Sequence, residues 1–521
     1  MAKDPLMLTL DFGTQSVRAA LIDKKGTIID IKKVTYDPPY KTVKPGYAEQ
    51  DPYFYLEVLA KASRPLVEDN KDKMGRVIGV SMSFFRDSPV ILGEDDEPLR
   101  DAILWLDERR AEASEKLPFW KSALFRLVGM TPTIELNRKR TFAQWIKENE
   151  PDIWVKVKKY MTLSTFVTMH LVGKYVDSPA SQAGHIPIDF KNCVWYKRSA
   201  LKNVYGIPEE TLCELVPVGE VMGEITEKAS KITGLPKGLK MFACGSDKSA
   251  ETLGLGCLDY RTAAVSYGTA SSLEITTKKY SDAEPFLPSY PSVVKGYYNM
   301  EVQIYRGYWM LNWFTREFGF ERVEKLIEKA ETLRNLDEAM SKIAPGCDGL
   351  LLQPYWGPGL RRPLAKGAIV GFSDRHTAVH LYRAILEGIA YALREGLEFF
   401  EKKRTHKKTE KIRISGGGSR SDAICQITAD IFGLPVSKIQ TNECSSLGAA
   451  ISGFIAAKEF SSAEEAVEAM VHQTIEFRPN EENHKRYDYL FKKVYMKMYP
   501  SLKESYKDLS NFEKLVEKGK I

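Results

Sequence analysis

Leu10-Asp11-Phe12-Gly13-Thr14-Gln15-Ser16-Val17-Arg18 is the stretch that decides the fold of this 521-residue chain. Its centre returns at mid-chain as Ser266-Tyr267-Gly268-Thr269-Ala270-Ser271, so the pattern aromatic-Gly-Thr-x-Ser occurs twice. Each copy lies between two apolar runs, which predicts a strand, a tight turn and a second strand. Glycine lets such a turn approach a ligand closely, and its N–H groups and hydroxyls can surround phosphate oxygens. Two copies predict duplicated lobes that close on one polyphosphate.

Length and composition agree with two folded units. A chain of 521 residues exceeds the usual size of one core, and a hydrophobic share of 43% is enough to fill two. Strands alternate with helices in both halves, including helices expected near 308–330 and 376–402, which predicts an α/β protein. We place an N-terminal lobe at residues 1–253, a C-terminal lobe at 254–480 and a helical tail at 481–521.

Charge, cysteine content and hydropathy argue against several classes of protein. The net charge of +6 comes from 75 basic and 69 acidic residues, without a concentrated basic block in the first 400, so we expect no nucleic-acid partner. Seven cysteines without CxxC spacing argue against a disulfide framework or a zinc ribbon. Because the sequence has neither a signal pattern nor a membrane-spanning apolar run, we expect a cytoplasmic protein without a membrane partner.

Two aspartates stand where predicted strands end. Asp11 enters the first glycine turn, and Asp247 follows Phe242-Ala243-Cys244-Gly245-Ser246. The carboxyl ends of strands in α/β folds commonly face a ligand crevice. If that ligand is a nucleoside triphosphate, one carboxylate suits hydrated Mg²⁺ and the other suits a general base for an attacking hydroxyl. The alternative is that each aspartate only caps its turn.

A third glycine-rich segment, Gly416-Gly417-Gly418-Ser419, links a predicted strand at 412–414 to a predicted helix at 422–432. Such a turn lets a flat base or a phosphate lie against the backbone and a helix N-terminus, although it can also be a plain tight turn. The sequence contains neither the GxGxxG pattern with a ribose-binding acid nor GxxxxGK[ST]. It therefore belongs to neither the dinucleotide-binding nor the P-loop class.

Taken together, these motifs resemble the FGGY family of carbohydrate kinases, within the actin–hexokinase–Hsp70 ATPase superfamily. The resemblance covers nearly the whole chain. It implies an α/β fold of two ribonuclease-H-like (actin/hexokinase-type) lobes around an interlobe cleft. Its carriers are Leu10 to Arg18, Ile103-Leu104-Trp105-Leu106-Asp107-Glu108-Arg109-Arg110, Cys244 to Asp247, Tyr267-Gly268-Thr269, Gly367-Ala368-Ile369-Val370-Gly371, Glu387-Gly388-Ile389-Ala390, Ser415 to Leu434 and Leu447-Gly448-Ala449-Ala450.

The resemblance implies ATP-dependent phosphorylation of a sugar or polyol hydroxyl, with ATP and Mg²⁺ as cofactors. By match to the family motifs, Asp247 is the general base, and Asp11 with Asp247 forms the metal site. The implied ATP phosphate-binding residues are Gly13, Thr14, Gln15, Arg18, Gly268 and Thr269. The implied adenosine-binding residues are Gly416, Gly417, Gly418 and Asp422. Members of the family are often dimers or tetramers, so a homodimer is compatible with the resemblance.

The segment after the predicted strand at 77–82 bears on the substrate. Xylulokinases of the family usually carry Met-His-Gly here, and Ser83-Phe84-Phe85-Arg86-Asp87-Ser88 lacks that signature. Arg86-Asp87 instead resembles the Arg-Glu of glycerol kinases, which suits a diol, although it can also be a surface ion pair. Trp105 matches the aromatic that these kinases pack against substrate carbons, although a lone Trp can also belong to the core.

Three departures weigh against glycerol. Asn137 replaces a tyrosine, Lys248 replaces the glutamine after the catalytic aspartate, and Leu273 replaces an aromatic. We therefore expect a wider, more polar pocket and rank a ketose (pentulose-type) or polyol first and glycerol second. Lys248 either binds a substrate oxygen or lowers the pKa of Asp247. The expected substrate-binding residues are Arg86, Asp87, Trp105, Asn137, Asp247 and Lys248.

Two functions of other classes stay open at this stage. One is a catalytically silent regulator of the same fold that binds a sugar or a nucleotide. The other is a nucleotide-gated assembly protein, as actin and Hsp70 are. The presence of both Asp11 and Asp247 argues against the silent regulator.

Overall fold

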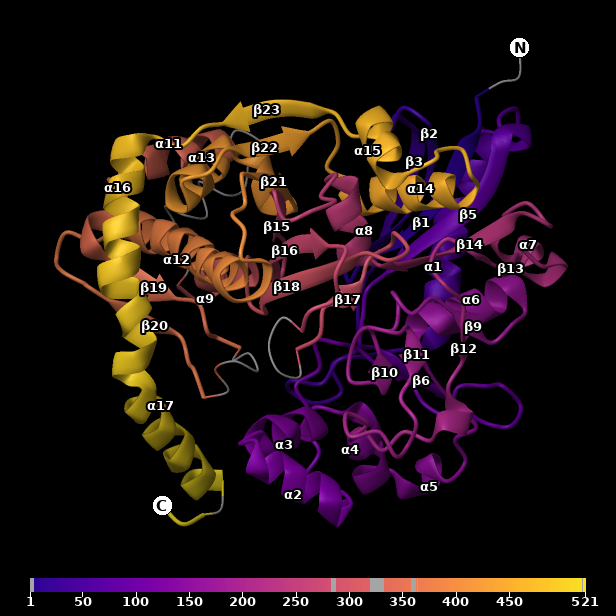
Figure 1. The fold of residues 1–521 in the computed structure, drawn as a ribbon, viewed down its shortest axis with the longest axis horizontal. Helices are drawn as coiled ribbons and strands as arrows, with labels where there is room; N and C mark the ends of the chain where they lie inside the picture. The colour runs from indigo at the N-terminus through magenta and orange to yellow at the C-terminus, as the bar shows by residue number, and fades with distance from the viewer. Residues whose placement is uncertain (1–3, 283–286, 319–331, 358–361, 363, 518) are drawn as a thin grey trace.

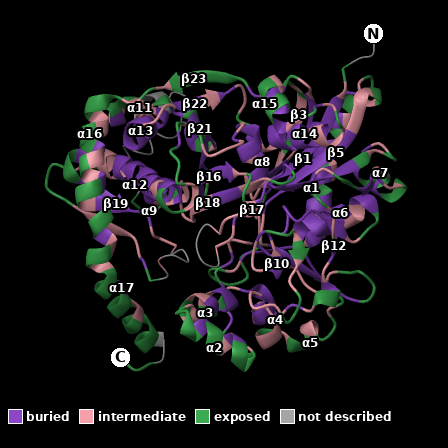
Figure 2. Ribbon diagram, in the orientation of Figure 1, coloured by how far each residue is buried: buried purple, intermediate pink, exposed green. Residues whose placement is uncertain are grey.

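Two large sheets, with helices on their faces, form the framework of the molecule (Figure 1). The computed structural model describes residues 4–282, 287–318, 332–357, 362, 364–517 and 519–521. The strands of both sheets are mostly buried, whereas much of the C-terminal helix is exposed (Figure 2).

The first sheet has six strands. Its order is β13 (Val221–Glu224), β14 (Lys240–Ser246), β5 (Val77–Phe84), β1 (Leu6–Phe12), β2 (Ser16–Asp23) and β3 (Ile28–Thr35). Strands β1, β2 and β3 form an antiparallel meander, and β5 and β14 extend the sheet in parallel to β1. Strand β13 closes the edge antiparallel to β14.

The second sheet repeats this topology with one additional short strand. Its order is β17 (Tyr290–Pro291), β18 (Tyr298–Ile304), β16 (Ser271–Thr277), β15 (Thr262–Tyr267), β21 (Lys411–Ser415), β22 (Val436–Ile439) and β23 (Gln473–Phe477). Strands β15, β16 and β18 form the meander, β21 and β22 are the parallel strands, and β23 is the antiparallel edge. The two glycine turns therefore occupy equivalent hairpins, and the predicted fold of two ribonuclease-H-like lobes is confirmed.

Burial on both faces explains why the central strands are mostly apolar. All seven residues of β1 are buried, as expected for a strand covered on both sides. Helix α1 (Pro52–Asp69) covers one face, and Asp51 caps it by accepting a hydrogen bond from the Tyr53 N–H. Its inward residues Tyr55, Leu59 and Leu66 lie at helical spacing and are buried.

Helices α8 (Asp247–Gly254) and α14 (Cys444–Ala456) lie between the two sheets (Figure 1). Helix α8 follows β14 of the first sheet, yet its Thr252 hydroxyl donates a hydrogen bond to Glu274 of the second sheet. Helix α14 follows β22 of the second sheet, yet Gly453 lies against Met7 of the first sheet. Each lobe therefore packs one helix on the sheet of the other lobe.

The two exchanged helices cross at glycines. A Cβ atom at Gly254 would lie 1.9 Å from the Cys444 carbonyl oxygen, and one at Gly448 would lie 1.8 Å from the Ala250 carbonyl oxygen. The helix backbones touch directly, because a side chain of any size would force them apart. A hydrophobic cluster drawn from both halves of the chain surrounds this crossing, and it includes Met7, Ala20, Ile22, Leu253, Ala264, Leu447, Ile451 and Phe454.

The C-terminal half adds α9 (Trp309–Phe318), α12 (Ala378–Phe400) and α13 (Asp422–Phe432) around the second sheet. Residues 319–330 of the helix expected near 308–330 lie outside the described residues. In the tail, α16 (Glu481–Leu490) packs into the C-terminal lobe through the fully buried Tyr487, and α17 (Met496–Glu517) continues along its side (Figure 1). Among the described residues, no helix is both long and apolar enough to cross a membrane.

We expect the Gly448→Ala substitution to destabilise the protein, because its methyl group meets backbone rather than a movable side chain. Overpacking of this kind costs about 1–3 kcal/mol. Thermal unfolding followed by circular dichroism should show a midpoint lowered by about 1–3 °C. Gly75→Ala is the matched control, since a Cβ atom there meets nothing within 4 Å. Equal midpoints for the two variants would contradict the close helix crossing.

Candidate functional site

Asp247 is the first residue of α8, directly after β14. The helix is capped by Ser246, whose hydroxyl accepts a hydrogen bond from the Ser249 N–H at 3.2 Å. Asp247 Oδ1 accepts only a short-range bond from the Lys248 N–H at 2.8 Å. The capping function therefore belongs to the neighbouring serine, and the position of Asp247 is not explained by helix capping.

Asp11 and Asp247 lie at the same end of the first sheet. Asp11 pairs with Ser83 of β5, and Ser246 of β14 pairs with Phe84 of β5. Two strand spacings therefore separate the aspartates, roughly 10 Å between backbones. The Ser83 hydroxyl donates to Asp11 Oδ1 at 2.8 Å, which holds this carboxylate at the end of β1.

Burial dominates the titration of both aspartates. It raises the pKa of Asp11, against the opposing effect of Arg18. It also raises the pKa of Asp247 to about 6, where the positive charges of Lys248 and Arg86 lower the value and the carboxylates of Asp11 and Glu251 raise it. Asp247 is thus a carboxylate that is mostly ionised at neutral pH and still basic enough to accept a proton.

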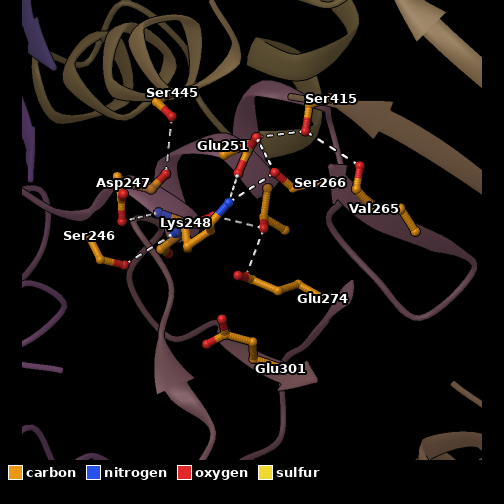
Figure 3. Close-up of polar contacts among 12 residues, drawn as sticks. Ser246, Asp247, Lys248, Glu251, Val265, Ser266, Glu274, Glu301, Ser415 and Ser445 are labelled. Carbon is orange, nitrogen blue, oxygen red and sulfur yellow. Dashed lines mark hydrogen bonds and ion pairs between the residues drawn. The ribbon is translucent and has the colours of Figure 1, made fainter. Parts of the chain in front are cut away.

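Lys248 points toward the second lobe (Figure 3). Its Nζ donates to Glu251 Oε2 at 2.8 Å and to the Ser266 hydroxyl at 2.9 Å. Glu251 Oε1 accepts from Ser266 at 2.9 Å and from Ser415 at 2.6 Å. Lys248 is therefore held in an internal network rather than directed at a substrate, and it acts on Asp247 through its charge. The charge of Lys248 lowers the pKa of Asp247, as one of the two interpretations expected, and substrate binding by Lys248 stays a prediction.

The first glycine turn is joined to the predicted substrate wall. The indole N–H of Trp105 donates to the Thr14 hydroxyl at 3.0 Å. Gly13 closes the turn by donating its N–H to the Ser16 carbonyl at 3.0 Å, and Gln15 is exposed beside it. Arg18 forms ion pairs with Asp11 and with Glu443 at the start of α14. The predicted phosphate-binding residues of this turn thus lie together with Trp105 and Asp11.

The second turn and the glycine triplet form another cluster. Gly416 has a φ of +80°, and a Cβ atom there would lie 2.6 Å from the Tyr267 carbonyl oxygen. Gly418 lies against the ring of Tyr308, whose N–H donates to the Gly268 carbonyl at 3.0 Å. Gly268 and Thr269 therefore lie beside Gly416 and Gly418, as expected for neighbouring phosphate and adenosine sites.

Asp422 differs from the other members of the predicted adenosine set. It is the first residue of α13, and its carboxylate pairs with Lys438 Nζ at 2.7 Å. Its side chain is 64% exposed. Asp422 lies near the glycine triplet in the sequence, but its carboxylate forms an ion pair with Lys438 at the surface.

The structure separates the side chains of Arg86 and Asp87. Arg86 donates two hydrogen bonds to Glu301, at 2.7 and 2.8 Å. Asp87 pairs with His185, whose Nδ1 lies 2.7 Å from Asp87 Oδ2. Although burial alone would raise the pKa of Asp87, the contacts with His185 lower it. The two residues therefore do not form the surface ion pair that the sequence allowed, and their part in binding a diol stays a prediction.

Asn137 and Leu273 are held by their own structural elements. Asn137 lies on α3 (Thr131–Lys139), where its amide donates to the Thr133 carbonyl of the same helix at 3.2 Å, and its part in substrate binding stays a prediction. Leu273 is fully buried in the core of the C-terminal lobe. Strand alternation instead turns its neighbour Glu274 to the α8 side, where it accepts from Thr252.

Sequence reasoning missed three glutamates near Asp247, of which Glu274 is buried and Glu251 and Glu301 are partly buried. Glu251 lies one helical turn after Asp247, and Glu274 and Glu301 lie opposite each other on β16 and β18 (Figure 3). A signal was present, because both strand glutamates interrupt apolar segments, Leu273-Glu274-Ile275 and Met300-Glu301-Val302. A charged residue within a buried strand is rarely neutral in function.

The residues at Asp11 fit a hydrated Mg²⁺ better than a metal held by protein alone. Among the described residues, no group of three histidine, cysteine or acidic side chains is close enough to hold a metal ion. Mg²⁺ commonly uses one or two carboxylates together with waters and substrate phosphates. The carboxylate of Asp11 also raises the pKa of Asp247, a repulsion that a cation between them would relieve.

Comparison with known proteins decides the family. Residues 6–254 match the sequence model of the FGGY family of carbohydrate kinases, N-terminal domain, and residues 263–457 match that of the C-terminal domain. The chain belongs to this family. It is therefore an ATP-dependent carbohydrate kinase, as the resemblance implied, with a small-molecule sugar as substrate.

Relatives of this FGGY kinase carry different substrate names. A xylulose kinase of Lactococcus lactis is 28% identical over 97% of this chain and 99% of its own. A gluconokinase of Bacillus licheniformis is 25% identical over 98% of each. Among solved structures, a gluconate kinase from Lactobacillus acidophilus has a TM-score of 0.81 at 22% identity, covering 97% of this chain and all of its own. A glycerol kinase from Plasmodium falciparum has a TM-score of 0.73 at 19% identity, covering 95% and 98%.

Because Asp247 is the predicted general base, we expect kcat/KM to fall as the pH drops through about 6, where this carboxylate becomes protonated. Lys248 lowers that pKa, so Lys248→Gln should raise it and move the acidic limb of the pH profile to higher pH. The measurement is kcat/KM against pH with an accepted sugar. Lys231→Gln, which removes an exposed cation, is the control. An acidic limb that stays in place or moves downward in Lys248→Gln contradicts the prediction.

Proposed function

We propose that this carbohydrate kinase transfers the γ-phosphoryl group of ATP to a hydroxyl of a ketose, of pentulose type, or of a polyol, with Asp247 as the general base. The observation that carries the proposal is the partly buried carboxylate of Asp247, directly after β14, whose pKa is raised to about 6. Such a group is ionised at the working pH and still accepts a proton from a hydroxyl. It also lies where both lobes meet, because α8 packs on the second sheet.

The two glycine turns are proposed to hold the ATP phosphates. Phosphoryl transfer depends on alignment and charge neutralisation more than on covalent chemistry. Gly13, Thr14, Gln15 and Arg18 would contact the phosphates from the first lobe, and Gly268 and Thr269 from the second. Gly416, Gly417 and Gly418 would support the adenosine. When bound beside Asp11 and Asp247, Mg²⁺ would neutralise phosphate charge.

A ketose or polyol is favoured by the polar lining around Arg86. The guanidinium lies between the Glu301 carboxylate and the ring of Tyr290, so hydroxyl groups find both donors and acceptors here. The named relatives include a xylulose kinase. Glycerol is the second candidate, because Asn137, Lys248 and Leu273 depart from the glycerol kinase pattern.

We expect the purified protein to release ADP from MgATP only when an acceptable sugar is present. A coupled ADP assay should be run with pentuloses, hexuloses, tetruloses, pentitols, glycerol and aldonates. A pentulose or a pentitol should give the highest kcat/KM. Release that none of these compounds stimulates above the basal rate would contradict the proposed function.

The Asp247→Asn substitution should lower kcat by several orders of magnitude, because an amide cannot accept the hydroxyl proton. Binding of ATP measured by calorimetry without Mg²⁺ should change little, since the phosphates are assigned to the glycine turns. Asp508→Asn, at an exposed position of α17, is the control and should behave as the wild type. Equal loss of nucleotide binding and turnover would mean that Asp247 has another role.

A further inference from the structure

The guanidinium of Arg86 is held by an acid from the other lobe. Arg86 follows β5 of the first sheet, and Glu301 is the central residue of β18 in the second sheet. Two parallel hydrogen bonds of 2.7 and 2.8 Å join them, and the two side chains are 14% and 7% exposed. Bidentate arginine–carboxylate pairs of this kind are strong and geometrically specific.

Arg86 lies within electrostatic reach of the proposed general base. The positive charge of Arg86 is near enough to Asp247 to lower its pKa. Tyr290 packs over the guanidinium at 5.1 Å from Cζ to the ring centroid, which restricts the approach to its planar face. The polar atoms of a substrate bound at Asp247 would therefore lie close to Arg86 and Glu301.

Acidic groups dominate the wall that faces Arg86. Glu301 stands directly opposite Glu274 in the β16–β18 register. Glu274 accepts hydrogen bonds from Thr252 at 2.8 Å and from Asn299 at 2.9 Å. Burial, together with the neighbouring Glu301, raises the pKa of Glu274. With a pKa of about 8, Glu274 is mostly protonated at neutral pH, so the negative charge of this wall lies on Glu301, and a further negative charge beside it is unfavourable.

A substrate carboxylate would compete with Glu301 for the same guanidinium fork. Displacing Glu301 would leave its carboxylate buried and unpaired, which is strongly unfavourable. A neutral polyol needs no such displacement, since its hydroxyls can donate to the remaining lone pairs of Glu301 and accept from the remaining N–H groups of Arg86. The ion pair thus distinguishes a hydroxyl from a carboxylate at one end of the substrate.

We propose that Glu301 is a specificity-determining residue that excludes sugar acids from this kinase by occupying Arg86 and leaves it selective for neutral ketoses and polyols. The inference rests on the proposed function for the location of the substrate. It assigns to Glu301 the discrimination between neutral sugars and sugar acids such as gluconate.

The test compares gluconate with glucitol, which have the same carbon chain but differ in a terminal carboxylate or hydroxymethyl group. Binding to the wild type and to Glu301→Gln is measured by calorimetry, and phosphorylation by ADP release. Glu301→Gln removes the negative charge and leaves one acceptor for the two N–H groups of Arg86, so gluconate should bind roughly tenfold more tightly or better, as expected when a charged hydrogen-bond partner becomes available. Glucitol should bind no more tightly than to the wild type.

Glu274→Gln and Glu301→Asp control for nonspecific effects, and Glu301→Met repeats the removal of the charge. Glu274→Gln changes the opposite glutamate, which is not hydrogen-bonded to Arg86, and should give a much smaller gain for gluconate. Glu301→Asp retains the charge and should continue to reject gluconate. Glu301→Met removes the charge at similar volume and should reproduce the gain, so the test does not depend on the folding of one variant.

The inference is overturned if neither charge-removing variant of Glu301 gains affinity for gluconate, if glucitol gains equally, or if the wild type binds gluconate as tightly as glucitol. These outcomes differ from failure of the proposed function. That failure would appear as an absence of sugar-stimulated ADP release in the wild type. Calorimetry would still show whether removing the charge of Glu301 increases the affinity for gluconate.

Discussion

The direct backbone contact between α8 and α14 is the constraint on which the rest of the structure depends. Gly254 and Gly448 allow the two helices to cross without intervening side chains. The crossing fixes the start of each helix, so Asp247 enters the site from one lobe and Glu443 reaches Arg18 from the other. The networks around Lys248 and Glu251 form only because α8 lies on the second sheet.

The parts of the fold and site that could be predicted from the sequence are those encoded by neighbouring residues. The glycine turns, the strands before Asp11 and Asp247 and the helix 422–432 depend on local apolar patterns and turn residues. Because the pattern occurs in both halves, the duplicated topology could also be predicted from the sequence. The sequence model of the family then extended these local observations to a carbohydrate kinase.

The partners of the charged side chains could not be predicted in the same way. Arg86 and Glu301 are 215 positions apart, and Asp87 and His185 are 98 apart, so their pairing depends on how whole strands and loops come together. Leu273 and Glu274 illustrate the same limit at shorter range. A shift of one residue along a strand exchanges the core face for the site face, and propensity alone does not decide which face is buried.

The exchange of α8 and α14 has a consequence for modularity. The hydrophobic cluster between the sheets takes its residues from both halves, with Met7 and Ile22 on one side and Leu447 and Phe454 on the other. A fragment ending near residue 254 would carry α8 without the sheet that covers it and would expose the apolar face that α14 normally covers. The two halves of this kinase are therefore better described as complementary fragments of one folding unit than as separable domains.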